Sequence, residues 1–158
     1  MAELKHILVV DDHFEMLEFL RSMLEMSNAN YRVLGVPSAE EGLLELKRRS
    51  HQGDPFDLLI TDVRLAGMSG FELARKVRDL RPDMPIIIIT AYASVQGRKE
   101  AELLGVHRYF EKPLDTDALL ASVHGALYPD GEAPPAVMRP ASRTDSLQQG
   151  AAPERQGV

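Results

Sequence analysis

Polar side chains that could do chemistry follow the apolar runs of this sequence. Asp62 is the clearest case, because the stretch DLLIT at 57–61 leads directly into this single carboxylate. Carboxylates gathered at one place repel each other at neutral pH unless cations compensate them. A divalent metal ion together with a lysine would supply that compensation. The residues in comparable places are Asp11, Asp12, Asp62, Thr90 and Lys112.

The donor types indicate which metal and which reaction. Carboxylates in a chain without cysteine, and without histidines at ligand spacing, favour Mg²⁺, with Mn²⁺ as a second choice. Such an ion neutralises the oxygens of a phosphoryl group during transfer, and a carboxylate can act as the nucleophile. We therefore predict phosphorylation of an aspartate.

The elements that must position these residues alternate along the chain. Apolar runs separated by segments with helical spacing predict parallel strands crossed by helices. The run PIIIIT is unbroken and largely β-branched, as expected of a strand buried on both faces. In an open parallel sheet, ligands bind outside the carboxyl ends of the strands, so the polar residues would meet there. The five runs lie at 6–10, 31–36, 57–60, 85–90 and 107–110.

Helix boundaries are signalled as well. Ser38 and Ser69 each precede a glutamate by three residues, which matches the capping box of a helix N-terminus. Pro82 and Gly105 are expected to end two of the helices. The pattern therefore predicts an α/β fold in which helices cross between buried parallel strands.

Composition limits the possible classes of function. With 158 residues, 44% of them hydrophobic, the chain is long enough for one domain with a real core. A net charge of −6 disfavours direct binding of nucleic acid, and the lack of cysteine excludes disulfides and thiolate metal sites. The N-terminal apolar stretch is too short for a signal peptide or a membrane span, so we expect a cytoplasmic protein.

The composition changes near the C-terminus. Residues 129–158 are rich in Pro, Ala, Gly, Ser and Gln and show no periodicity. Too few apolar residues are present to offset the entropy lost on ordering. We therefore expect a folded domain at 1–128, followed at 129–158 by a disordered tail or linker.

Taken together and in order, these motifs resemble the receiver domain of response regulators, the phosphoaccepting part of two-component signalling, across roughly residues 4–128. The layout is similar to that of single-domain chemotaxis regulators. It implies a flavodoxin-like, doubly wound five-stranded parallel sheet of order 2-1-3-4-5 with five helices. The resemblance rests on Asp11-Asp12, Asp62 with Gly70 eight residues later, Thr90-Ala91, and Lys112-Pro113.

The resemblance implies a role for each residue at the metal and phosphoryl positions. Asp62 would be the phosphoacceptor, and Lys112 would pair with the phosphoryl oxygens. Asp12 would bind Mg²⁺ directly and Asp11 through a water molecule, with the backbone carbonyl of Arg64 as a third protein ligand. The domain would catalyse only its own phosphorylation and dephosphorylation, so we do not expect an enzyme.

The resemblance also implies a switch. Thr90 would donate its hydroxyl to the phosphoryl group, which adds charge and acceptors only in the modified state. Tyr109 would turn inward as Thr90 moves, and the Lys112-Pro113 peptide bond would be cis. A sensor histidine kinase or histidine phosphotransfer protein would donate the phosphoryl group. The surface at about 94–127 would then bind a downstream protein or a second copy of the chain.

Three residues near the predicted site need separate interpretation. Arg64 and Tyr92 are bulky where small or polar residues are usual, and we predict that they slow loss of the phosphoryl group by crowding the attacking water. His13 follows the acidic pair directly. It is either a solvated side chain in the first helical turn, which we favour, or a side chain that reaches the metal site.

Other interpretations stay open at this point. An isolated acidic pair such as Asp11-Asp12 often caps a helix, and a receiver can act as a scaffold without phosphorylation. A phosphohydrolase of the haloacid dehalogenase type also uses Asp, Mg²⁺ and Lys, but its D-x-D pattern is broken here by His13. A nucleotide- or flavin-binding module would need a glycine-rich phosphate loop, and none follows the predicted strands.

Overall fold

The computed structural model describes residues 3–130, and their arrangement depends on a sheet whose middle strands are buried on both faces. Every residue of β3 (Leu58–Asp62) and β4 (Ile86–Thr90) is buried. Leucine and isoleucine fill both sides of these strands, because crossover helices cover a parallel sheet on both faces. The strand order is β2-β1-β3-β4-β5, which confirms the predicted order. The other strands are β1 (Lys5–Val10), β2 (Tyr31–Val36) and β5 (Arg108–Glu111).

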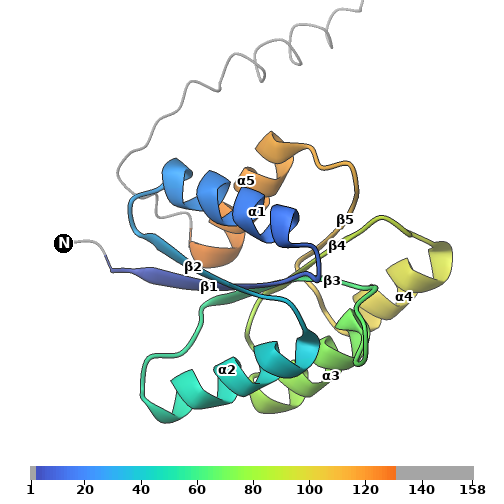
Figure 1. Ribbon diagram of the computed structural model, residues 1–158, viewed down its shortest axis with the longest axis horizontal. Helices are drawn as coiled ribbons and strands as arrows, with labels where there is room; N and C mark the ends of the chain where they lie inside the picture. The colour runs from blue at the N-terminus through green and yellow to red at the C-terminus, as the bar shows by residue number, and fades with distance from the viewer. Residues whose placement is uncertain (1–2, 131–158) are drawn as a thin grey trace, which may run out of the picture.

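The helices form a layer on each side of the sheet (Figure 1). Ile7 and Val9 of β1 pack in one core, whereas Leu8 and Val10 pack in the other, because successive strand residues point to opposite faces. One core contains α1 (Phe14–Ser27) and α5 (Thr116–Leu127), and the other contains α2 (Ala39–His51), α3 (Gly70–Leu80) and α4 (Val95–Leu103).

The helix boundaries follow the signals in the sequence. Ser69 caps α3 in a complete capping box with Glu72. Ser38 caps α2, because its side chain accepts a hydrogen bond from the Glu41 amide at 3.1 Å. The sequence predicts a capping box at each serine. Within residues 3–130 the box at Ser69 is complete, whereas Ser38 has only the bond to its own side chain. Gly105 follows α4 with a φ of +68°, a conformation that favours glycine.

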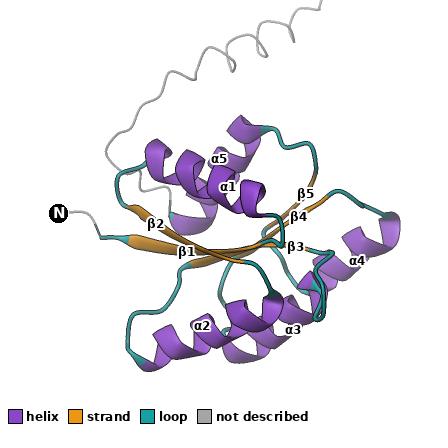
Figure 2. Ribbon diagram, viewed as in Figure 1, coloured by secondary structure: helices purple, strands orange, loops and turns teal. Residues whose placement is uncertain are grey.

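The loops that leave the strands converge at one edge of the sheet (Figure 2). Parallel strands place all their carboxyl ends at this edge, so residues far apart in sequence meet there. No helix among residues 3–130 is long and apolar enough to cross a bilayer. Of the predicted tail at 129–158, all but the first two positions lie outside the described residues.

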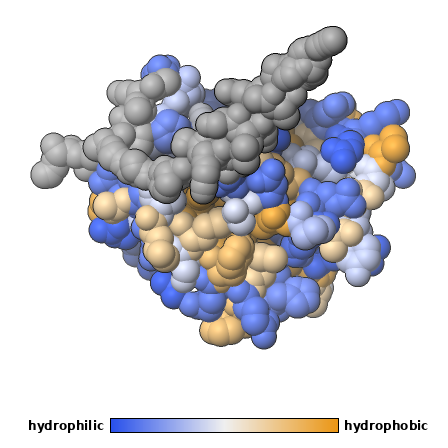
Figure 3. Space-filling view, turned by 90° about the horizontal axis from the view of Figure 1, so that it is seen from above, coloured by the Kyte–Doolittle hydropathy of each residue, from blue (hydrophilic) through white to orange (hydrophobic). Residues whose placement is uncertain are grey.

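The face that carries α1 and α5 is not uniformly polar. Hydrophobic side chains gather near the middle of the surface seen from above, with hydrophilic ones around them (Figure 3). Three large apolar side chains of α1 are exposed, namely Phe14, Phe19 and Met26. Single exposed apolar residues are normal on a protein surface.

One buried hydroxyl generates a stability prediction. Ser122 in α5 is 5% exposed, and its Oγ has no hydrogen-bond partner among the described residues. An unpaired buried hydroxyl costs roughly 1–3 kcal/mol, and alanine is the better helix former. We expect Ser122→Ala to raise the free energy of unfolding by about 1 kcal/mol in urea denaturation.

Ser27→Ala is the matched control, because the Ser27 hydroxyl donates to the Leu24 carbonyl at 2.7 Å. This variant should gain no stability. A Ser122→Ala protein that is less stable than the wild type would show that the hydroxyl is paired in solution.

Candidate functional site

The register of β1 and β3 places two carboxylates side by side. Val10 aligns with Thr61, so Asp11 and Asp62 each follow in neighbouring positions. Only 3% of Asp11 and 5% of Asp62 is exposed. Two buried carboxylates at one place require a cation.

Lys112 supplies that cation from the loop after β5. Its Nζ lies 3.2 Å from Asp11 Oδ2 and 3.0 Å from Asp62 Oδ2. Burial works to lower the pKa of Lys112, but hydrogen bonds and charge interactions with Asp62 and Asp11 outweigh burial, and the pKa is raised. The lysine therefore stays charged between the two carboxylates.

Backbone groups place the lysine. The Lys112 amide donates to the carbonyl of Thr90 at 2.8 Å, which ties the loop after β5 to the end of β4. The Lys112-Pro113 peptide bond is cis. The lysine is thus fixed to the same edge of the sheet as the residues it contacts.

The second oxygen of each carboxylate is held by the backbone. Asp62 Oδ1 accepts from the amides of Val63 at 2.6 Å and Arg64 at 3.3 Å. Asp11 Oδ1 accepts from the amide of His13 at 2.9 Å. Asp11 therefore does not cap the first turn of α1, whose N-cap residue is His13 and has no side-chain cap bond.

His13 lies closer to the carboxylates than its favoured interpretation implied. Its ring is 70% exposed, as expected for a solvated residue, but Nδ1 lies 3.1 Å from Asp11 Oδ1 and 3.2 Å from Asp12 Oδ1. Ligand atoms of Asp11, His13 and Asp62 all lie within 4.8 Å of one another. The sequence alone could not predict these contacts, because the side chain of a residue at the start of a helix can point either into solvent or toward the carboxylates.

Thr90 ends β4 next to the strand of Asp62. The register aligns Asp62 with Ile89, and the Thr90 side chain is fully buried. Thr90 Oγ1 accepts from the Tyr92 amide at 3.0 Å. A hydroxyl that accepts one hydrogen bond can still donate another, so Thr90 can serve an acceptor placed near Asp62.

Arg64 and Tyr92 come from two different loops and stack on each other. The guanidinium carbon of Arg64 lies 4.0 Å from the centroid of the Tyr92 ring, which is cation–π geometry. The pair joins the loop that follows Asp62 to the loop that follows Thr90.

Gly70 brings the far end of the loop after Asp62 close to the backbone where the loop begins. The Gly70 amide donates to the Val63 carbonyl at 2.9 Å. A Cβ atom at Gly70 would lie 1.9 Å from the backbone oxygen of Asp62, so only glycine fits. Glu40 of α2 holds the far side of the loop by accepting from the Met68 amide at 2.9 Å.

Tyr109 lies on β5, beside the middle of β4. It aligns with Ile88, is half-buried and packs against the core that contains α4. All the residues predicted for the site thus lie at or near one edge of the sheet.

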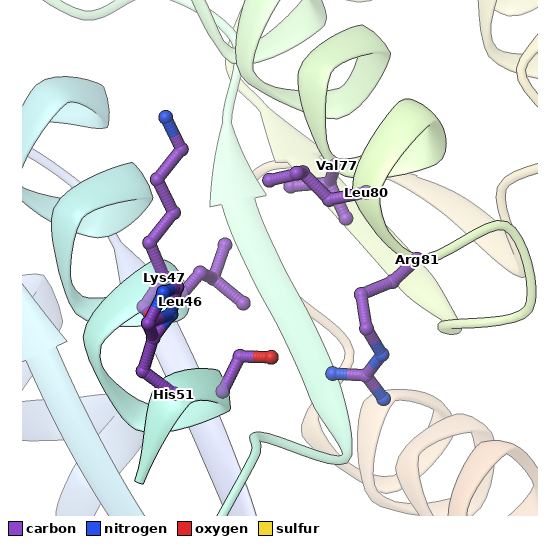
Figure 4. A pocket seen from close by; sticks show the side chains of 7 residues that line it. Leu46, Lys47, His51, Val77, Leu80 and Arg81 are labelled. Carbon is purple, nitrogen blue, oxygen red and sulfur yellow. The ribbon is translucent and has the colours of Figure 1, made fainter.

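A separate hollow lies between α2 and α3 (Figure 4). It lies at the C-terminal ends of these helices, which run back from the edge that carries Asp62. Apolar side chains from both helices and three basic residues line it, but it contains none of the predicted site residues. The lining residues are Leu46, Lys47, Ser50, His51, Val77, Leu80 and Arg81.

Comparison with known families identifies this arrangement. Residues 7–124 match the family of response regulator receiver domains. The chain belongs to this family, whose members are the receiver domains of two-component response regulators.

Individual relatives agree with the family. The chain is 35% identical over 122 residues to the transcriptional regulatory protein GlrR of Escherichia coli K12, a match that covers 77% of this chain and 26% of that protein. It is 33% identical over 141 residues to the response regulator protein FleR of Pseudomonas aeruginosa, covering 87% of this chain and 28% of that protein. The chain therefore spans about a quarter of the length of these curated relatives.

A solved structure has the same fold. A CheY-like receiver domain protein from Methanospirillum hungatei is similar with a TM-score of 0.71 and 33% identity. The match covers 79% of this chain and 94% of that one.

The raised pKa of Lys112 generates a prediction for metal-free protein. Asp11→Asn removes one of the charges that stabilise the ammonium form, so the pKa of Lys112 should fall in an NMR titration of its Nζ. Because the folded pKa lies above the ordinary 10.5, the stability from this interaction is fully present below that pH. It is lost as the pH rises through the raised value.

Asp57→Asn is the control, because the Asp57 carboxylate accepts from the His6 amide at 2.8 Å, apart from the lysine. This variant should leave the Lys112 pKa unchanged. An equal Lys112 pKa in Asp11→Asn and wild-type protein would contradict the role given to Asp11.

Proposed function

We propose that this receiver domain accepts a phosphoryl group on Asp62 from a sensor histidine kinase or a histidine phosphotransfer protein. The observation that carries the proposal is the shared lysine, whose Nζ bridges Asp11 and Asp62. A buried carboxylate held on one oxygen by backbone amides is oriented for attack, and a fixed ammonium group beside it can pair with the incoming phosphoryl oxygens.

The transfer step balances without a further reactant. An oxygen of Asp62 forms a bond to phosphorus while the bond from phosphorus to the donor histidine nitrogen breaks. The electron pair of the broken bond stays on the histidine nitrogen, and Asp62 becomes an acyl phosphate. The protein acts only on its own aspartate in this proposal.

The donor set fits a hard divalent cation. Asp11, Asp12 and Asp62 carry three negative charges near a single lysine, and every ligand proposed from them is an oxygen. We propose that Asp12, Asp11, Asp62 and the Arg64 carbonyl hold Mg²⁺, or Mn²⁺ in its place. When bound, the ion would neutralise the oxygens of the transferred group.

Thr90 and Tyr109 would convert the modification into a change of surface. The Thr90 hydroxyl gains a charge-assisted hydrogen bond only when a phosphoryl group is present, and a differential interaction of this kind shifts an equilibrium between two states. Tyr109, on the neighbouring strand β5, would turn inward as Thr90 moves toward the phosphoryl group.

Exposed apolar residues support the proposal that the domain binds other proteins. Val95 and Leu103 of α4 are 75% and 88% exposed, within the predicted partner surface at about 94–127. Phe14 is also exposed, directly after His13, and offers the donor protein an apolar contact beside the acidic site.

The output is proposed to pass through a downstream protein or a second copy of the chain. We propose a receiver at 1–128, a tail or linker after it, and no direct contact with nucleic acid, because the chain has a net charge of −6. A cytoplasmic location fits a kinase as the donor.

The acceptor can be tested by intact mass. After incubation with Mg²⁺ and acetyl phosphate, the wild type should gain the mass of one phosphoryl group, and Asp62→Ala should gain none. Asp57→Ala controls for removal of a different aspartate and should gain the group. A gain in Asp62→Ala would place the acceptor elsewhere, and no gain in the wild type would favour the scaffold interpretation.

We further propose that the stacked Arg64 and Tyr92 slow hydrolysis of the acyl phosphate. Hydrolysis needs a water molecule in line with the breaking bond, and two bulky side chains at the loops around Asp62 would crowd it. The double variant Arg64→Asn, Tyr92→Ala should therefore lose the phosphoryl group several-fold faster after removal of the donor, as followed by intact mass.

Arg32→Asn, which alters an exposed arginine on β2, is the control and should keep the wild-type rate. Faster loss in wild type than in the double variant would reverse the assigned effect.

A further inference from the structure

Tyr109 lies against α4 at a place where only a glycine leaves room. Gly97 is a buried residue of this helix. A Cβ atom on Gly97 would lie 2.5 Å from the Tyr109 hydroxyl oxygen and 3.1 Å from Ser94 Oγ. The first distance is far inside van der Waals contact, so a side chain at this position would displace the end of the tyrosine ring.

The backbone of Gly97 is fixed where the tyrosine meets it. Its amide donates to Ser94 Oγ at 2.9 Å, and this bond caps the N-terminus of α4. This bond keeps the shape of the first turn of α4. The atom that a Cβ would meet first is the hydroxyl at the far end of the Tyr109 side chain, so a shift of the ring is the simplest way to relieve the clash.

The ring has contacts on other sides as well. The guanidinium carbon of Arg98 lies 5.2 Å from the centroid of the Tyr109 ring. The ring also packs against the core cluster that includes Ala101 of the same helix. Tyr109 thus meets α4 at two consecutive residues, through the close approach at Gly97 and the cation–π contact with Arg98.

Glycine weakens a helix, so its presence in the first turns of a nine-residue α4 calls for a reason. Gly125 of α5 gives a comparison, because the nearest atom to a Cβ there is His107 Nε2 at 3.9 Å. Alanine would fit at Gly125 and would not fit at Gly97. The close approach of Tyr109 supplies the reason at Gly97.

We propose that Gly97 is a positioning residue for the switch. Because it has no side chain, it leaves room for the Tyr109 ring to lie against α4 and so to connect β5 to that helix. The inference rests on the proposed function, since movement of Tyr109 matters only if Asp62 is phosphorylated. A Cβ atom at this position displaces Tyr109 without phosphorylation. The α4 surface then no longer responds fully to the state of Asp62.

The first experiment tests the contact alone, by urea denaturation of Gly97→Ala in the wild-type and Tyr109→Phe backgrounds. The variant should lower the unfolding midpoint in the wild-type background. It should lower the midpoint by less in the Tyr109→Phe background, because the nearest ring atom would then be the carbon at 3.4 Å, an ordinary contact. The clash with Ser94 is common to both backgrounds and cancels.

Gly125→Ala is the matched control, since it makes the same change in another helix. It should shift the midpoint equally in both backgrounds. An equal effect of Gly97→Ala in both backgrounds would contradict the proposal that Gly97 makes room for the Tyr109 ring.

The second experiment follows Tyr109 itself by ¹⁹F NMR of protein labelled with fluorotyrosine. The chain has four tyrosines, and Tyr109→Phe assigns the resonance. In wild type, Mg²⁺ with beryllofluoride, a mimic of the phosphoryl group, should shift this resonance. In Gly97→Ala the resonance should already be displaced without the mimic, and the further shift should be smaller.

Both remaining outcomes decide against the inference. A Tyr109 resonance that is the same in Gly97→Ala and wild type, with the same response, shows that the glycine positions nothing. If the Tyr109 resonance of the wild type does not shift when the mimic is added, Tyr109 does not respond to the state of Asp62 and Gly97 cannot position a switch. The mass experiment on Asp62 reports separately whether the proposed phosphorylation occurs.

Discussion

The structure depends on one ammonium group shared by two buried carboxylates. Lys112 reaches Asp11 and Asp62 from the end of β5, so it joins three strands that are far apart in sequence. Without the lysine, the two carboxylates would face each other in a site with little water to screen them. The same charge arrangement underlies the proposal of a divalent cation and a phosphoryl group here, because the excess negative charge would be compensated by a metal and the fixed positive charge would meet the incoming oxygens.

Much of the fold follows from residue types that the sequence displays openly. The run at 31–36 is the observed β2, and the other four runs differ from their strands by one or two residues at one or both ends. These shifts arise because apolar character marks where a strand is buried, whereas its ends depend on hydrogen bonds to neighbours. His107, for example, donates its amide to the Ile86 carbonyl at 2.7 Å but lies just before β5.

The site was predictable to the extent that its residues are unusual for their positions. A charged residue at the end of a buried strand is conspicuous, so Asp11, Asp62 and Lys112 could be singled out. The contacts of His13, Glu40 and Gly97 could not, because each depends on where a backbone or ring comes to lie after folding. A glycine in a helix and a glutamate in a first turn have ordinary explanations until the atom that approaches them is known.

The sheet separates two cores, one with α1 and α5 and the other with α2, α3 and α4. Tyr109 and α4 belong to the second core, so rearrangement of this switch would disturb the packing of one layer only. If the proposed function holds, α1 with the exposed Phe14 would keep its shape for the donor while α4 changes for the target. The α5 part of the surface at about 94–127 shares a core with α1, so mutations at α4 would tune the response of that surface without altering the packing beside the donor contact.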